Sequence, residues 1–290
     1  MRILTLFVRH GTAKYGEVLD DLLTFYRRQL PSVVHDVVVV DNAMQEPLVS
    51  PVGRPTFIAG SNRFWEFSAW DEALAHVGRR AWDYDYVHLA TSAFRTLYTR
   101  YLDRFAGPML ERVAGRGVAI GHIDYYNEPV QLLGYRSQQW LRSCFMFLPP
   151  AELATLGPLV GVSNAARFFS GDPARPFRAD APISETYQRY ILDWLTGPGT
   201  GQGVTWHSRF LVTAESLLYF QAKVLAMLNE HMLAIRLRRQ GCMLVDATWL
   251  ATQIASSGRS AAVATIPYWR VQLAERDTDA VPLPSEQGSI

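Results

Sequence analysis

Polar side chains directly follow two strongly apolar segments near the start of the chain. Arg9 and His10 come after the run from Ile3 to Val8, and Asp41 comes after four consecutive valines at 37–40. An arginine binds phosphate oxygens through paired hydrogen bonds. A histidine exchanges protons or accepts a phosphoryl group, and a carboxylate accepts hydrogen bonds from N–H and hydroxyl donors. These residues are therefore the first candidates for a functional site.

Carboxylates with a suitable setting recur in the second half of the chain. Asp172 and Asp180 lie in a segment, 164–182, that is rich in Gly, Pro, Asp and Arg, and Glu185 follows Ser184 at the start of a helical pattern. A positioned carboxylate accepts the proton of an attacking hydroxyl and so acts as a general base. A glutamate in a first helical turn also stabilises the helix dipole, which is the alternative role of Glu185. The sequence therefore offers three carboxylates whose chemistry would suit a general base.

These residues need a scaffold, and the hydrophobic pattern predicts one in which strands and helices alternate. Short apolar runs bounded by polar residues are typical of strands buried on both faces of a parallel sheet. The alternation predicts an α/β fold with a mostly parallel sheet flanked by helices, and ligands of such sheets bind outside the carboxyl ends of the strands. The expected strands are 3–8, 37–40, 56–59, 86–89, 118–120 and 144–148, and the expected helices between them are 17–30, 67–77 and 93–105.

The second half of the chain changes from alternation to loops and longer helices. Segments rich in Gly, Pro, Asp and other polar residues predict loops, whereas Ser184 and Gly241 are suited to begin and to end helices. The expected elements are loops at 122–139, 164–182 and 197–203, helices at 184–195 and 210–240, a shorter helical stretch after Gly241, and a polar tail from Glu275.

The composition is that of an ordered globular chain. Of the 290 residues 49% are hydrophobic and 19% are charged, so there is enough apolar surface to offset the conformational entropy lost on folding. We divide the chain into an α/β domain at 1–205, with halves at 1–110 and 111–205, and a helical C-terminal extension at 206–290. The net charge of +1 gives no electrostatic footprint for nucleic acid, which we exclude as a partner. The chain has two lysines, Lys14 and Lys223.

The sequence carries no pattern for export or for crossing a membrane. Its first residues lack the basic start and cleavage site of a signal peptide. The longest apolar segment, 217–237, is interrupted by Lys223, Glu230 and His231, whereas a span takes about 20 apolar residues. Both cysteines lie in apolar stretches, which is typical of buried thiols in a reducing compartment. We therefore expect a cytoplasmic protein, with peripheral contact to the inner face of the membrane as a further expectation.

Three segments, in order, carry a resemblance to a known family. They are Val37 to Asn42, Gly60 to Leu74, and Ser143 to Leu148 with the Glu152 to Gly157 stretch after it. Together they resemble glycosyltransferases of the GT-A type, close to the bacterial family-2 and rhamnan-synthesis enzymes of polysaccharide biosynthesis, over residues 1 to about 255. The resemblance implies a GT-A-like nucleotide-diphospho-sugar transferase fold, a nucleotide-sugar donor, and a saccharide or lipid-linked acceptor.

The resemblance also implies which residues bind the donor. Asp41 ends the second strand, where such enzymes commonly contact the base or ribose of the nucleotide. The segment from Gly60 onward is similar to the loop and helix that lie over the donor, and Thr91 and Ser92 begin the helix after the fourth strand, where backbone N–H groups favour phosphate. The donor-binding candidates are Val8, Arg9, His10, Asp41, Asn62, Arg63, Asp71, Thr91, Ser92 and Arg95.

The aromatic and polar residues of 122–139 and just beyond fit an acceptor saccharide. Sugar rings present apolar faces to aromatic side chains and hydroxyls to polar ones, and an ordinary polar connection is the alternative. In inverting members of the family a carboxylate near the start of a helix after the acceptor strand removes the proton of the acceptor, and Glu185 takes that place, with Asp172 and Asp180 as rivals. The acceptor-binding candidates are Asp124, Tyr125, Tyr126 and Trp140.

The sequence departs from the family at the metal site. Most GT-A enzymes carry an Asp-x-Asp or similar pair just after the fourth strand, where it holds a divalent cation against the diphosphate. This chain has Ala90-Thr91-Ser92 there, and its Asp83-Tyr84-Asp85 precedes the strand. We therefore assign no metal ligand and expect donor binding to need little or no divalent cation, with magnesium or manganese as the alternative cofactor.

Two other functions stay open on the sequence. Arg9-His10-Gly11 after a buried strand resembles the signature of histidine phosphatases, in which the histidine takes the phosphoryl group, and the second histidine that they need would be His207. The missing acidic pair also fits a degenerate domain that binds a sugar nucleotide without turnover. A phosphatase would hydrolyse a chromogenic phosphate ester, whereas a degenerate domain would bind nucleotide and leave every acceptor unchanged.

Overall fold

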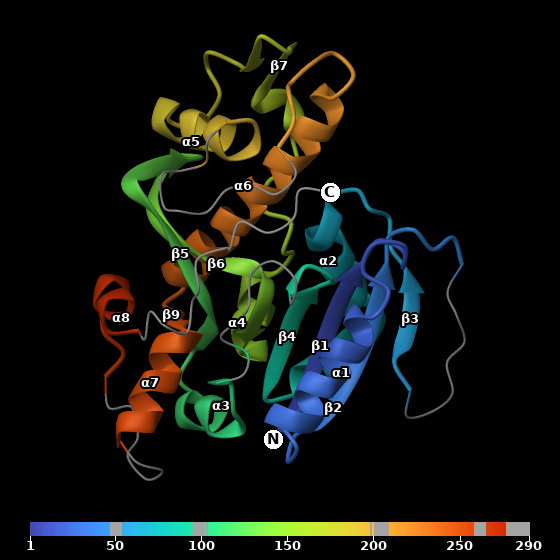
Figure 1. Cartoon of the computed structure of the whole chain (residues 1–290), viewed down its shortest axis with the longest axis vertical. Coiled ribbons are helices and arrows are strands. Elements are labelled where there is room, and N and C mark those ends of the chain that lie inside the picture. Colours follow the sequence, from blue (N-terminus) through green and yellow to red (C-terminus); the bar gives the residue numbers. More distant parts are fainter. Residues whose placement is uncertain are drawn as a thin grey trace.

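The computed structural model describes residues 1–46, 54–94, 102, 104–197, 199, 209–257 and 265–276, and its centre is a seven-stranded sheet. The strands lie in the order β3 (Thr56–Ala59), β2 (Val34–Asp41), β1 (Arg2–Arg9), β4 (Tyr86–Thr91), β6 (Tyr135–Leu148), β5 (Val118–Leu132) and β9 (Met243–Asp246). β6 runs antiparallel to β4 and β5, and the other neighbours are parallel (Figure 1). The expected α/β fold with a mostly parallel sheet is therefore confirmed.

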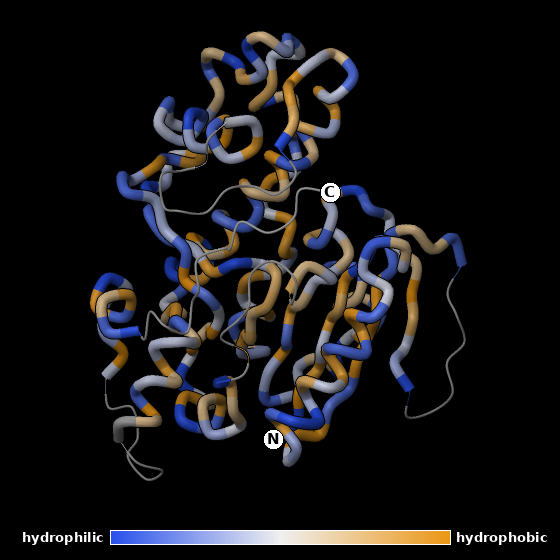
Figure 2. The backbone as a smooth tube through the Cα atoms, in the orientation of Figure 1, coloured by the Kyte–Doolittle hydropathy of each residue, from blue (hydrophilic) through white to orange (hydrophobic). Residues whose placement is uncertain are grey.

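Helices cover both faces of this sheet, because alternate residues of each strand point to opposite faces. In β1, Ile3 and Phe7 pack toward one face, and Leu4 and Leu6 pack toward the other. Figure 2 shows the apolar colour running through the central strands, as burial on both faces requires. The first face is covered by α1 (Val18–Gln29), α3 (Gly107–Val113) and α7 (Ala247–Ser257), and the second by α2 (Trp65–Val77), α4 (Pro150–Leu156) and α6 (Leu217–Arg239).

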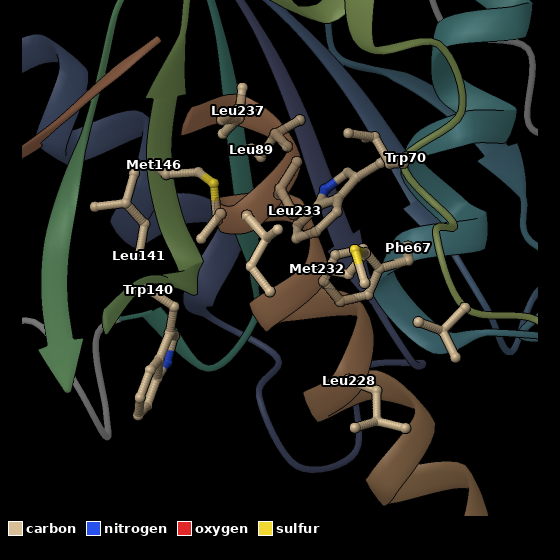
Figure 3. Packing of buried hydrophobic residues seen from close by; sticks show 14 of the residues in the cluster. Phe67, Trp70, Leu89, Trp140, Leu141, Met146, Leu228, Met232, Leu233 and Leu237 are labelled. Carbon is tan, nitrogen blue, oxygen red and sulfur yellow. The ribbon is translucent and has the colours of Figure 1, made fainter. Parts of the chain in front are cut away.

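Helix α6 joins this sheet to a second layer of structure. Where α6 lies over the sheet, its Met232 and Leu233 point toward Phe67 and Trp70 of α2 (Figure 3). Its first turns continue past the carboxyl ends of the parallel strands (Figure 1). There they meet α5 (Glu185–Leu195) and the small hairpin formed by β7 (Phe169–Asp172) and β8 (Arg175–Phe177). We call α5, this hairpin and the first turns of α6 the upper layer.

Aromatic packing holds the upper layer together. The ring of Phe220 in α6 lies with its centroid 6.4 Å from that of Phe169 in β7 and 5.7 Å from that of Phe177 in β8. Phe220 is fully buried, and burying one such side chain stabilises a fold by about 1.5 to 3 kcal/mol. The remaining described elements are α8 (Trp269–Glu275) and the short 3-10 helices η1 (Gly78–Asp83) and η4 (Ala165–Arg167).

The segment 122–139 is not the loop that its composition predicts. It forms the distal part of a long β5–β6 hairpin, which reaches the upper layer through a bridge between Leu132 and Ile183. The strand pairing shifts register between Gly121 and Ile123 and again between Tyr125 and Val130. Such bulges break the alternation of polar and apolar residues, so the local pattern hides the strands.

The C-terminal part is not the purely helical extension that the sequence predicts. Residues 243–246 form β9, which pairs with β5 and completes the sheet, so a boundary at 205 would divide one sheet. Asp246 ends β9, and its Oδ1 accepts the N–H of Thr248 and of Trp249, both at 3.0 Å, at the start of α7. A strand of four residues gains most of its stability from its neighbour, and its own pattern carries little signal.

Other expectations at element ends have clear outcomes. Ser184 is the N-cap of α5, because its Oγ accepts the N–H of Tyr187 at 3.3 Å. Gly241 follows α6 with a φ of +95°, the left-handed conformation that suits glycine, so both expected helix ends are confirmed. The expected surface loop at 164–182 contains β7 and β8. The expected helix at 93–105 and link at 197–203 lie largely outside the described residues.

A buried amide fixes α6 to the segment after α4 and provides a test of this architecture. The fully buried Asn229 accepts the N–H of Gly161 and of Val162 at 2.8 Å and donates to the Val162 carbonyl at 2.9 Å. We expect Asn229→Ala to lower the free energy of unfolding by about 3 kcal/mol, since each buried polar group left without a partner costs about 1 to 3 kcal/mol. Urea denaturation measures this loss.

The matched control is Asn127→Ala, which removes the same amide from an exposed position of the β5–β6 hairpin. It should change the free energy of unfolding by no more than about 0.5 kcal/mol, as surface substitutions usually do. Equal effects of the two substitutions would contradict the role given to Asn229.

Candidate functional site

One carboxylate ties together the carboxyl ends of β1 and β2. Asp41 lies opposite Arg9 in the strand register, and its Oδ2 accepts from Arg9 Nε at 2.7 Å. Its Oδ1 accepts the backbone N–H of Gly11 at 2.8 Å and of Ala43 at 3.0 Å. Burial acts to raise the pKa of Asp41, but these hydrogen bonds and the Arg9 charge outweigh it and lower the pKa below its ordinary value. Asp41 is therefore ionised and fixes the turn after β1.

The loop after β3 lies very close to the end of β2 and is strained. A Cβ at Gly60 would lie 2.1 Å from Asn42 Oδ1, so this approach requires glycine. Asn42 Nδ2 donates to Asn62 Oδ1 at 3.1 Å and to the Trp65 carbonyl at 3.5 Å. Asn62 and Trp65 both have a φ of +55°, and such backbone strain costs about 1 to 3 kcal/mol per residue. Because strain of this kind concentrates at functional sites, the loop belongs to the candidate site.

The end of β4 contributes hydroxyl groups to the same edge of the sheet. Ser92 N donates to the Val8 carbonyl at 2.9 Å, so the chain after β4 stays beside the end of β1. The side chains of Thr91 and Ser92 are partly exposed. The pairing of β4 with β6 ends at Ala90 and Phe145, and Ser143 lies two residues from Phe145 along β6. Ser143 therefore lies near the end of β4, and a cluster of charged residues contacts it there.

Two carboxyl groups from different helices meet at Ser143. Its backbone N–H donates to Glu230 Oε1 of α6 at 2.5 Å, and its Oγ donates to Glu66 Oε1 of α2 at 3.3 Å. Burial raises the pKa of Glu230 to about 7, and the nearby charges of Glu66 and Asp124 add to this rise. Burial also raises the pKa of Glu66. A carboxyl group whose pKa lies near neutrality is suited to accept a proton.

A lysine completes this group, and we call Glu66, Ser143, Lys223 and Glu230 the charged cluster. Lys223 Nζ lies 4.3 Å from the centroid of the Trp65 ring. The pKa of Lys223 is lowered to about 8, because burial and repulsion by Lys14 outweigh the attraction to Glu66 and Glu230. Lys223 therefore carries its charge at neutral pH, beside the strained loop that contains Trp65.

Two of the four acceptor-binding candidates belong to the core instead. Tyr126 is 2% exposed and stacks on Tyr190 of α5, and Trp140 is 8% exposed and contacts His231 of α6. Buried rings of this kind offer no face to a saccharide, so their assignment is corrected. Asp124 and Tyr125 are partly exposed. Asp124 Oδ1 accepts the backbone N–H of Tyr125 at 3.0 Å, and its Oδ2 accepts from Arg142 Nε at 3.0 Å.

The three expected bases lie at exposed positions in the upper layer, apart from the charged cluster. Glu185 is exposed in the first turn of α5. Asp172 accepts the Ala174 N–H at 2.9 Å in the β7–β8 turn, and Asp180 pairs with Arg178 at 2.8 Å. Asp172 and Asp180 therefore have local structural roles, whereas no described side chain engages Glu185 by a hydrogen bond that would fix it.

The donor-binding candidates divide into residues that lie at the carboxyl edge of the sheet and residues that do not. Asp71 is turned away from the carboxyl edge, because its carboxylate accepts the N–H of Leu159 at 2.6 Å and of Val160 at 3.1 Å and so anchors the segment after α4. That structural role corrects its assignment. His10 and Arg63 are exposed in the loops at the edge. The candidates that the structure brings together at the carboxyl edge are Val8, Arg9, His10, Asp41, Asn62, Thr91 and Ser92, and Arg95 lies outside the described residues.

The charged cluster is the part of the site that the sequence analysis missed. Glu66 lies inside the segment that resembles the donor loop, yet nothing in its spacing distinguishes it from a surface residue. Lys223 and Glu230 gave a clearer signal, because both interrupt the long, mainly apolar segment at 217–237. Charged residues are almost never buried without a partner, so charges within an apolar helix point to a site.

Comparisons with known proteins give no match: no family model, no curated protein and no solved structure matches this chain. Among the described residues, no group of three or more His, Cys, Asp and Glu side chains is arranged to hold a metal ion. Within the same residues, none of the helices combines the length and the apolar character needed to cross a bilayer.

The Asp41 carboxylate predicts a pH-dependent stability. Its pKa is lower in the folded than in the unfolded chain, so its stabilising effect is complete above the unfolded value of about 4 and is lost as pH falls through the folded value. At pH 6 we expect Asp41→Asn to lower the free energy of unfolding by about 2 kcal/mol, the usual contribution of hydrogen bonds to a charged group. The difference from the natural protein should shrink as pH is lowered to 3.

Urea denaturation at several pH values measures that difference, with Asp83→Asn, an exposed residue of η1, as the matched substitution that leaves stability at pH 6 unchanged. A deficit of constant size between pH 6 and pH 3 would mean that the charge of Asp41 does not contribute.

Proposed function

We propose that this chain is a glycosyltransferase of the GT-A type, which moves a sugar from a nucleotide-diphosphate donor to a saccharide or lipid-linked acceptor in polysaccharide biosynthesis. The observation that carries the proposal is the sheet. Its strands β3, β2, β1 and β4 run parallel and helices cover both faces, which is the mostly parallel, helix-flanked sheet that the resemblance implies. The polar groups gathered at the carboxyl edge of that sheet support a ligand site there.

The donor would lie across the carboxyl ends of β1, β2 and β4. Arg9 presents a guanidinium next to the turn after β1, and Thr91 and Ser92 present hydroxyls. The strained loop at 60–65 lies beside them and would cover the nucleotide. Asp41 already accepts three hydrogen bonds, so it would act on the nucleotide through the turn that it fixes and through the one remaining acceptor position of Oδ2.

The acceptor would approach from the upper layer. Asp124, Tyr125 and Glu230 lie on the side of the site that faces β5, β6 and α6, and the exposed Glu185 lies beyond them on α5. In the transfer step, the acceptor oxygen bonds to the anomeric carbon, the bond from that carbon to the diphosphate oxygen breaks, and a carboxylate takes the acceptor proton. We place this reaction at the cytoplasmic side, with the membrane contact that a lipid-linked acceptor requires.

The described residues favour transfer over a histidine phosphatase. His10 is exposed, and the buried histidines of the described residues are held elsewhere: His88 bonds Thr5 in the middle of β1, His122 Nδ1 lies 3.9 Å from Asp246 Oδ2, and His231 bonds Tyr187. The partly buried His35 also bonds Thr5. The candidate second histidine, His207, lies outside the described residues. A degenerate domain without turnover is distinguished from a transferase by the experiments that follow.

Nucleoside diphosphates should stabilise the protein without a divalent cation. Thermal unfolding is followed with UDP, GDP, dTDP and their sugar conjugates, in chelator and with added manganese. A ligand present at 100 times its dissociation constant adds about 2.7 kcal/mol of stability. For the nucleotide that stabilises the protein, Asp41→Ala should weaken binding by about 1 to 3 kcal/mol, because it frees the turn after β1 and leaves N–H donors unpaired. If chelator abolishes binding and manganese restores it, the expected metal independence is wrong.

Two carboxylates compete for the role of general base, and substitution separates them. Glu185 is the base that the resemblance implies, whereas Glu230 is the one whose pKa, about 7, and position at the carboxyl edge suit proton transfer. Glu→Gln keeps size and hydrogen bonding but removes basicity. Substitution of the true base should therefore lower the rate of sugar transfer at least about 100-fold and leave donor binding unchanged. Asp172→Asn and Asp180→Asn are the controls, and should lose less.

Transfer of radiolabelled sugar to a defined acceptor measures the four variants side by side. Near-normal turnover of both Glu185→Gln and Glu230→Gln would remove both from the mechanism. Nucleotide binding without transfer by the natural protein, across a panel of acceptors, would favour the degenerate domain.

A further inference from the structure

We propose that the ammonium group of Lys223 binds the diphosphate of the donor, in the position where GT-A enzymes hold a divalent cation. The inference rests on the proposed glycosyltransferase function and deepens it, because it names the group that neutralises the leaving diphosphate. Three observations carry it: the residues after β4, the surroundings of Lys223, and the convergence of the two lysines of the chain.

The residues at the end of β4 do not fit a divalent cation. A site for Mg²⁺ or Mn²⁺ needs carboxylate oxygens, and Thr91 and Ser92 supply neutral hydroxyls instead. Two carboxyl groups, Glu66 of α2 and Glu230 of α6, contact Ser143 near the end of β4. Both attract Lys223, so these carboxyl groups already have a cation as a partner. The charge that the family supplies with a metal ion is here supplied by a side chain.

The surroundings of Lys223 hold its ammonium group at the carboxyl edge. Lys223 Nζ lies 4.3 Å from the centroid of the Trp65 ring, and Trp65 is tied to the end of β2 through its carbonyl and Asn42. An ammonium over an indole ring is attracted by the ring electrons. Glu66, which attracts Lys223 electrostatically, is the next residue along α2 and contacts Ser143, which lies two residues along β6 from Phe145, the partner of Ala90. The ammonium group therefore has defined neighbours at the start of α2, close to the ends of β2 and β4.

The second lysine of the chain lies close enough to repel the first. Lys14 comes from the turn after β1, far from Lys223 in sequence, and its charge lowers the pKa of Lys223. The repulsion between the two ammonium groups is unfavourable, and a bound diphosphate that contacts both would relieve it. Diphosphate carries several negative charges, whereas a neutral sugar or a nucleoside carries none, so the pair favours the diphosphate group of a nucleotide sugar.

The chemistry needs no proton transfer from the lysine. As the bond from the anomeric carbon breaks, its electron pair stays on the diphosphate oxygen, and the fixed ammonium stabilises the negative charge that develops there. The Thr91 and Ser92 hydroxyls would donate hydrogen bonds to the same oxygens. Lysine acts on phosphate as a compact point charge, which is the property that a metal ion provides.

Substitution of Lys223 tests the inference by binding, without an activity assay. Titration calorimetry in chelator compares the nucleoside diphosphate that binds the natural protein, chosen from UDP, GDP and dTDP, with the corresponding nucleoside. Lys223→Met should weaken binding of the diphosphate about 10- to 100-fold, because one charge-assisted contact is lost, and should leave the affinity for the nucleoside unchanged. Lys223→Arg, which keeps the charge, should recover much of the diphosphate affinity.

Arg239→Met is the matched control, because it removes a positive charge from the exposed last turn of the same helix. It should leave both affinities unchanged. If Lys223→Met binds diphosphate as tightly as the natural protein does, the inference is wrong while the proposed function stands. If the natural protein binds none of the three diphosphates or their sugar conjugates, the proposed function itself fails.

A second measurement uses the natural protein, so it does not depend on the folding of a variant. The chain has two lysines besides its N-terminal amine, so acetylation with acetic anhydride followed by mass spectrometry reports on each amine separately. Bound diphosphate should slow acetylation of Lys223 at least about tenfold, with the N-terminal amine as the internal reference, since a protonated, contacted amine is not nucleophilic. Unchanged labelling of Lys223 in saturating diphosphate would overturn the inference.

Discussion

Helix α6 lies against β6 and α2 over the sheet and against the β7–β8 hairpin beyond it, and its side chains fill the space between these elements. Phe220, Val224 and Leu228 are fully buried, and burial of each contributes about 1.5 to 3 kcal/mol. This packing fixes the upper layer over the carboxyl edge of the sheet. It also sets the position of every polar group that α6 carries, including Lys223 and Glu230. The site therefore depends on an apolar contact that takes no part in its chemistry.

The carboxyl edge itself is held by a few short-range polar contacts. Asp41 fixes the turn after β1, and Asn42 fixes the loop after β3, where Asn62 and Trp65 keep a backbone conformation that costs free energy. Local strain of about 1 to 3 kcal/mol per residue is small beside the burial of the sheet, whose strands are covered on both faces. A stable core can therefore hold an edge that is arranged for a ligand and not for its own stability.

The charged cluster is likewise unfavourable by itself and is held in place by the packing around it. Glu66, Lys223 and Glu230 lose hydration where the helices meet, and the pKa of each shifts in the direction that favours the neutral form of the side chain. Such partial burial is unfavourable by itself, and it is tolerated because the opposite charges lie together and Ser143 donates to both carboxyl groups. The same features give one group a pKa near neutrality and keep a cation beside Trp65 at the strained loop. They are the physical basis of the function proposed for this edge.

Much of the scaffold followed from the sequence, because local pattern reports burial. The apolar runs of β1, β2 and β4, the helical spacing of α1 and α2, and the ends at Ser184 and Gly241 are properties of neighbouring residues, and so is the position of Asp41 at the end of a strand. Only the tertiary structure decided the rest. β9 and the distal β5–β6 hairpin are strands because of the partners they meet, Tyr126 and Trp140 are core residues because α5 and α6 cover them, and Lys223, Glu66 and Glu230 form one cluster because two distant helices cross at Ser143. A sequence shows which residues carry charge or bulk, but the partner of each side chain is set by packing between segments that are far apart in the chain.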